Sequence, residues 1–233
     1  MAKISGIVFD KDGTLYDFNA TWGAWAESLL ISEVQGDMDR VSSLAAALGY
    51  DLENKVFLPG SIVIAETVPT VAERVLPLLP ETTLDALVSR MNRLSSGVLQ
   101  IEAAPLVPFV ESLKSRDIKI GVCTNDAERP ARDHLASSGV ETLFDFVAGY
   151  DSGYGAKPAP GPLLGFCKEV GLAPTDCVMV GDSLHDLEAG RAAGMMTVGV
   201  LTGPASADDL APLADAVLPS IAFLADWLDQ LNR

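Results

Sequence analysis

Basic residues, cysteines and long apolar runs are all scarce in this sequence. Its 16 lysines and arginines are outnumbered by 32 aspartates and glutamates, giving a formal charge of −16, which disfavours binding to nucleic acid or to an anionic membrane. The three cysteines, at 123, 167 and 177, form no close pair, which argues against a disulfide framework or a zinc site. No apolar run approaches the roughly 20 residues that cross a bilayer, and no signal-peptide pattern precedes Asp10. We therefore expect a cytoplasmic protein.

What the sequence does contain is a series of short apolar segments that are typical of strands. They are residues 4–9, 118–123, 144–148, 177–180, 196–201 and, more weakly, 216–218. From residue 118 onward they alternate with segments of helical length at 130–138, 160–170 and 184–193, each followed by a glycine suited to a helix C-terminus. This alternation predicts an α/β fold, with a Rossmann-like parallel sheet sandwiched by helices.

A long segment between the first two predicted strands follows a different pattern. Apolar residues recur there at three- and four-residue spacing, as in Trp22, Trp25 and Leu29, which indicates amphipathic helices. Further helices are expected at 37–49, 70–76 and 84–94. We predict an inserted all-helical cap domain over residues 16–101 and a discontinuous core of residues 1–15 and 102–233.

Polar residues follow three of the predicted strands directly. Asp10 ends the first, Thr124 ends the second and Asp182 follows the run that ends at Gly181. Open parallel sheets bind ligands at the carboxyl ends of their strands, so these residues are expected to meet in one pocket.

Four acids are expected in that pocket, namely Asp10, Asp12, Asp182 and Asp186. Two carboxylates about 4 Å apart repel by roughly 4 kcal/mol at an effective dielectric constant of about 20, so the group requires a cation or bound protons. Hard oxygen ligands with a substrate phosphate completing the octahedron favour Mg²⁺. A metal ion would also let so acidic a chain hold an anionic substrate.

The run from Asp10 to Thr14 also has a chemical interpretation. Two residues apart at a strand end, Asp10 and Asp12 can face one pocket, where one acid attacks phosphorus and the other transfers a proton. Gly13 permits a tight turn whose N–H groups face a phosphate oxygen. Lys157, next to Pro158 after a glycine-rich stretch, is a candidate cation for the phosphoryl group.

These residues, in this order, resemble the four motifs of the haloacid dehalogenase superfamily. The motifs are Asp10-Lys11-Asp12-Gly13-Thr14, then Thr124 with Asn125, then Lys157-Pro158, and finally Gly181-Asp182 with Asp186. The resemblance implies that Asp10 becomes an aspartyl-phosphate, that Asp12 acts as acid and then base, and that Thr124 and Lys157, with Asn125 beside them, bind the phosphoryl group. It also implies Mg²⁺ held by Asp10, the Asp12 carbonyl, Asp182 and Asp186, and it leaves His185 peripheral.

The inserted segment is similar to the helical cap of the phosphoglycolate phosphatase-like branch. The resemblance therefore implies a phosphatase acting on a small phosphorylated metabolite, with phosphoglycolate as a candidate substrate. Basic cap residues are candidate substrate contacts, namely Arg40, Lys55, Arg74, Arg90 and Arg93. The sequence does not distinguish a monomer from a homodimer.

The acid at position 12 distinguishes between activities that occur on the same fold. Haloacid dehalogenases do not use an acid at that position, because no alkoxide leaving group needs a proton. Phosphonate-cleaving relatives also lack it and use a cap lysine as a Schiff base, for which Lys55 is the only cap lysine available. A sugar phosphomutase would retain it and stays open as an alternative. A non-catalytic phospho-ligand-binding protein is the other alternative, although the presence of every motif residue favours hydrolysis.

Overall fold

The computed structural model describes residues 4–34, 37–58 and 60–231; residues 1–3 and 232–233 of the predicted core and 35–36 and 59 of the predicted cap lie outside these ranges. Six strands form one sheet in the order β5-β4-β1-β6-β7-β8, and every neighbouring pair is parallel. The strands are β1 (Gly6–Phe9), β4 (Lys119–Cys123), β5 (Phe146–Ala148), β6 (Cys177–Gly181), β7 (Met196–Val200) and β8 (Ala216–Leu218). The predicted α/β class is confirmed.

Strand periodicity divides the core into two layers, one on each face of the sheet. Ile7 and Phe9 of β1 pack in one apolar cluster, whereas Val8 between them packs in another. The first cluster includes residues of α5 (Leu106–Lys114), α6 (Glu128–Ser137) and α10 (Leu224–Leu231). The second includes residues of α7 (Gly161–Val170) and α8 (Leu184–Ala193). Helices cover both faces of the sheet, which explains why the strand sequences are continuous apolar runs.

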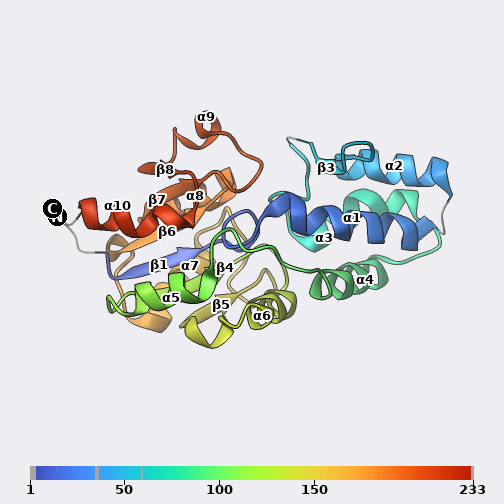
Figure 1. Ribbon diagram of the computed structural model, residues 1–233. Coiled ribbons are helices and arrows are strands. Elements are labelled where there is room, and N and C mark those ends of the chain that lie inside the picture. The colour runs from blue at the N-terminus through green and yellow to red at the C-terminus, as the bar shows by residue number, and fades with distance from the viewer. Residues whose placement is uncertain (1–3, 35–36, 59, 232–233) are drawn as a thin grey trace.

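The part of the chain between β1 and α5 forms a second lobe beside the sheet (Figure 1). Its helices are α1 (Phe18–Val34), α2 (Met38–Leu48), α3 (Val68–Val75) and α4 (Leu84–Ser96). They bury an apolar cluster of their own, which includes Trp22, Leu44 and Met91. A short antiparallel pair, β2 (Tyr50–Asp51) with β3 (Val56–Phe57), adds strand structure that the helical periodicity did not predict.

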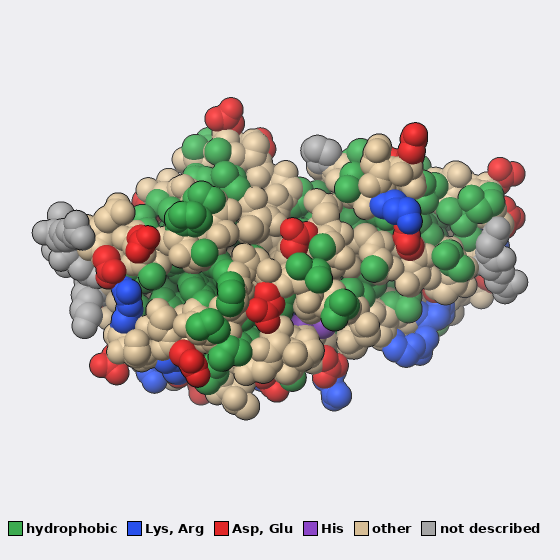
Figure 2. Space-filling model, viewed as in Figure 1, with side chains coloured by type: hydrophobic (Ala, Val, Ile, Leu, Met, Phe, Trp, Pro, Cys, Tyr) green, Lys and Arg blue, Asp and Glu red, His purple; other side chains and the backbone are tan. Residues whose placement is uncertain are grey.

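The smaller elements complete the chain without altering this arrangement. They are the short helix α9 (Ala207–Leu210) and the 3₁₀ turns η1 (Leu76–Leu78), η2 (Glu141–Leu143), η3 (Pro174–Asp176) and η4 (Ile221–Phe223). Among the helices of the described ranges, none is both long and apolar enough to span a membrane. In Figure 2 the acidic side chains are scattered over the face shown rather than gathered in one patch.

Candidate active site

The carboxyl ends of β1, β4 and β6 bring the predicted residues to one edge of the sheet. Asp10 follows β1, Thr124 follows β4, and Asp182 follows β6. Lys157 comes from the loop before α7, and its Nζ lies 2.6 Å from Asp10 Oδ1 and 2.5 Å from Asp186 Oδ1. All of these side chains are buried, so their charges interact in a medium that screens poorly.

Negative charge exceeds positive charge in this cluster. The ligand oxygens of Asp10, Asp182 and Asp186 lie within 4.8 Å of one another. Burial, opposed by Lys157 and reinforced by Asp186, raises the pKa of Asp10 to about 7. Burial and the neighbouring Asp10 raise the pKa of Asp182 well above its usual value. Burial would lower the pKa of Lys157, but Asp10 and Asp186 outweigh it and raise that pKa. The three acids offer oxygen ligands and only one ammonium opposes their charge, so the cluster fits a hard divalent cation.

Local structure holds two of these acids in place. Asp186 Oδ2 accepts hydrogen bonds from the backbone N–H of Ser183 at 3.0 Å and from its hydroxyl at 2.7 Å, so Asp186 caps α8 while it pairs with Lys157. Asp182 Oδ1 accepts a hydrogen bond from Thr14 Oγ1 at 3.2 Å. The motif-one turn therefore contacts the motif-four acid directly.

Gly13 is required by this packing. Its φ is +79°, and a β-carbon there would overlap the carboxylate of Asp182. Only glycine combines that backbone conformation with the space available.

The two predicted motif-two residues lie in different surroundings. Thr124 is buried at the wall of the pocket, and its Oγ1 accepts a hydrogen bond from the Asp126 N–H at 3.1 Å. Asn125 bonds the Lys157 backbone at both N–H (3.0 Å) and C=O (2.9 Å), and its Nδ2 also lies 2.7 Å from the carbonyl oxygen of Ala65. Asn125 thus ties the lysine loop to the inserted lobe, and its contact with phosphate stays a prediction.

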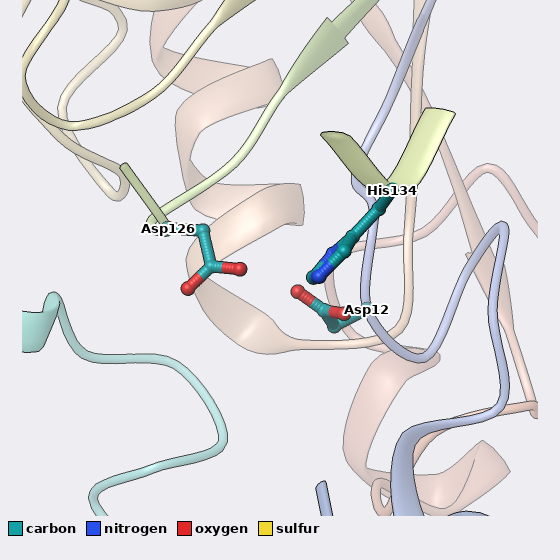
Figure 3. A group of neighbouring side chains, drawn as sticks. All are labelled: Asp12, Asp126 and His134. Carbon is teal, nitrogen blue, oxygen red and sulfur yellow. The ribbon is translucent and has the colours of Figure 1, made fainter. Parts of the chain in front are cut away.

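A second polar cluster surrounds the fully buried Lys11. Asp12, Asp126 and His134 converge on one point (Figure 3), and Lys11 Nζ lies 2.6 Å from Asp12 Oδ1, 3.2 Å from Asp126 Oδ2 and 3.1 Å from His134 Nδ1. The ammonium therefore already supplies a cation to this trio. The Asp12 carboxylate thus pairs with Lys11, and it belongs to a different group of neighbouring ligand atoms from Asp10, Asp182 and Asp186.

The shifted pKa values of this second cluster follow from burial. The carboxylates of Asp12 and Asp126 overcome desolvation and raise the pKa of Lys11 to about 12. Desolvation raises the pKa of Asp126 to about 6 despite Lys11. Burial and the Lys11 charge lower the pKa of His134 to about 4. Lys11, Asp126 and His134 were not predicted as site residues, although a lysine between two acids at a buried strand end is a signal for such a cluster.

A pocket lies between the sheet edge and the inserted lobe. Asp10, Asp12, Thr124 and Lys157 line its floor, and residues of α1, α3, α4 and the segment 63–66 line its other side. None of the five predicted basic contacts is among these described lining residues. Three of them are paired on the surface of the lobe: Arg40 with Glu81, Lys55 with Glu27 and Arg90 with Glu33. His185 lines the pocket, with its Nδ1 3.2 Å from the Ala65 carbonyl oxygen.

Comparison with known proteins gives a consistent picture. A family model for haloacid dehalogenase-like hydrolases matches residues 4–194. A phosphoglycolate phosphatase of Thiobacillus denitrificans is 28% identical over 95% of this chain and 94% of its own length. One from Rhodospirillum rubrum is 38% identical, but over only 50% of this chain and 48% of its own. The crystal structure of a HAD family hydrolase from Deinococcus radiodurans, with bound phosphate and sodium, has a TM-score of 0.68 at 23% identity, covering 100% of this chain and 98% of that one; this shows a shared fold.

Proposed function

Because the chain belongs to the haloacid dehalogenase-like hydrolase family, we propose that it hydrolyses a small phosphate monoester through an aspartyl-phosphate on Asp10. The observation that carries this proposal is the pairing of Asp10 with Lys157 at 2.6 Å, in a pocket that Asp12 also lines. A nucleophile, a proton carrier and a cation for the phosphoryl oxygens are thus close together.

The reaction divides into two displacements at phosphorus. The Asp10 carboxylate forms a bond to phosphorus as the ester P–O bond breaks, and the leaving oxygen takes a proton from Asp12. Asp12 then removes a proton from a water molecule, whose oxygen attacks the aspartyl-phosphate and releases inorganic phosphate and Asp10. Lys157 and Thr124 bind the phosphoryl oxygens throughout.

We assign the implied Mg²⁺ to Asp10, Asp182, Asp186 and the carbonyl oxygen of Asp12. The excess negative charge of the buried acids supports this assignment. When bound, the ion would neutralise charge on the phosphoryl oxygens. Lys157 and Ser183 already bond both oxygens of Asp186, so Asp186 would bind the ion through a bridging water.

Residues 16–101 act in this proposal as a cap that excludes water from the pocket. The contacts of Ala65 with Asn125 and His185 support a closed position of the lobe. Phosphoglycolate, the substrate named for two of the relatives, belongs in any panel of substrates.

The test is phosphate release from para-nitrophenyl phosphate by the purified protein with Mg²⁺. Asp10→Asn and, separately, EDTA should abolish release, whereas Asp85→Asn on the exposed face of α4 should retain it. Undiminished release by Asp10→Asn would refute the proposal. Isomerisation of a sugar phosphate without free phosphate would instead identify the mutase alternative.

A further inference from the structure

The two walls of the pocket differ sharply in polarity. The floor is polar, whereas the wall contributed by the inserted lobe is largely apolar. Its buried members are Phe18, Trp22, Trp25, Val68, Val71 and Met91. The part of a substrate that extends away from the phosphate must contact this wall.

Charge on the lobe's side of the pocket is limited to one acid. Glu66 is exposed and lines the pocket, and no lysine or arginine of the described lobe residues lines it. A carboxylate placed against this wall would lose hydration without gaining a cation, which is costly. Glu66 would add repulsion.

One donor on the wall lacks an acceptor. The buried Nε1 of Trp22 has no hydrogen-bond partner in the described structure, whereas Nε1 of its neighbour Trp25 lies 3.4 Å from the Met91 carbonyl oxygen. An unpaired buried N–H is expensive to maintain, and an acceptor on a bound ligand would satisfy it.

We propose that the substrate's leaving group is uncharged and mainly apolar, with a hydrogen-bond acceptor for Trp22. The proposal rests on the phosphatase activity proposed above. It predicts that short phosphorylated carboxylic acids, phosphoglycolate included, are poor substrates.

The test compares benzyl phosphate with para-carboxybenzyl phosphate on the unaltered protein with Mg²⁺. The two leaving groups have similar intrinsic reactivity, and we expect kcat/KM to be at least about tenfold higher for the benzyl ester. Glu66 is exposed, so it can be replaced without disturbing the core. Glu66→Lys should lower the ratio of kcat/KM for the benzyl ester to that for the carboxylated ester more than Glu66→Gln does. A preference for the carboxylated ester would overturn the substrate class and leave the phosphatase proposal intact. Absence of Asp10-dependent release from either ester would count against the phosphatase itself.

A separate set of contacts links the inserted lobe to Asp12. His134 Nε2 lies 2.7 Å from the carbonyl oxygen of Ser95, in the last turn of α4. The Lys11 ammonium has only donors, so His134 Nδ1 accepts from it and Nε2–H donates to Ser95. The neutral state of His134 is consistent with its lowered pKa.

We infer that Lys11 and His134 are positioning residues that couple the place of α4 to the orientation of the Asp12 carboxylate. The continuous path runs from the Ser95 carbonyl through His134 and Lys11 to Asp12. Displacement of α4 breaks the path at Ser95 and frees the imidazole that holds Lys11. Asp12 is therefore correctly placed only while the lobe is docked.

Two isosteric variants separate the two ends of this path. His134→Asn keeps an acceptor near the Nδ1 position but cannot reach Ser95, whereas His134→Gln keeps a donor near Nε2 but offers Lys11 no acceptor at Nδ1. The readout is the ratio of kcat/KM for benzyl phosphate to that for para-nitrophenyl phosphate, whose acidic leaving group needs little help from Asp12. We expect both variants to lower this ratio by about tenfold or more, and Asp133→Asn, one residue away on α6, to leave it unchanged.

The ratio of the two kcat/KM values distinguishes a positioning role for a residue from a general loss of protein stability. A variant that is merely less stable loses activity on both esters equally, and that result, or an unchanged ratio, would overturn the coupling. Lys11→Arg, which retains a cation, should preserve more of the ratio than Lys11→Met.

Discussion

Acid should destabilise this protein through His134, and the structure sets the size of the effect. The buried imidazole has a pKa of about 4 in the folded protein, against about 6.5 in an unfolded chain. Between these values the unfolded chain binds a proton that the native state does not, so the free energy of unfolding falls as the pH falls. The linkage relation gives a loss of about 2 kcal/mol from pH 7 to pH 5.

Buried carboxyl groups act in the opposite direction over the same range. Asp10 and Asp126, with pKa values raised to about 7 and about 6, keep protons in the native state that the unfolded chain has lost. Their contribution therefore increases stability as the pH falls. The histidine effect must be isolated as the difference between the unaltered protein and His134→Gln.

Urea unfolding at pH 7, 6 and 5, in EDTA, measures that difference. The unaltered protein should lose its advantage over His134→Gln by about 2 kcal/mol between pH 7 and pH 5. A constant difference between the unaltered protein and His134→Gln would refute a buried neutral imidazole.

Three further predictions follow from the contacts described. Gly13→Ala should abolish phosphate release, because its β-carbon would displace the Asp182 carboxylate; a variant with ordinary turnover would contradict this packing. Arg90→Met should lower the free energy of unfolding by about 1–3 kcal/mol in urea, since it removes the two-pronged, partly buried bond to the Glu33 carboxylate, and should spare kcat. Asn125→Leu should raise KM by about tenfold as the lysine loop and the lobe lose their shared anchor; an unchanged KM would show that the anchor is dispensable.

The sheet was predictable because a strand that is buried on both faces is a continuous apolar run in the sequence. Strands β1, β4 and β6 lie where apolar runs were expected, and the acids that follow them converge because parallel strands share an edge. The capping role of Asp186 also has a local signature, Ser183 three residues earlier. The strands and the cap can be recognised from neighbours in the chain, and the rule for parallel sheets then places the acids together.

The Lys11 cluster was not predictable in the same way. Lys11 and His134 are 123 residues apart, and only the packing of α6 against the sheet and against α4 of the inserted lobe brings them together. The basic residues of the lobe, whose contact with substrate stays a prediction, show the same dependence on distant partners. Their positive charge suggested contacts with substrate, but Arg40 pairs with Glu81 and Arg90 with Glu33. The partners are distant in sequence, so no local sequence pattern predicts these pairs.

The junction of the inserted lobe with the sheet has a consequence for how such a chain changes over evolution. The two chain segments that connect the lobe to the core run side by side. The Asp17 N–H donates to the Ile101 carbonyl at 2.8 Å, and the Ala103 N–H donates to the Leu15 carbonyl at 2.9 Å. For the core, the lobe is therefore a loop whose two ends are held together. The entropic cost of closing such a loop grows only with the logarithm of its length. Insertions, deletions or wholesale exchange of the lobe leave Asp10 and the strand register in place, so substrate choice can diverge without rebuilding the chemistry.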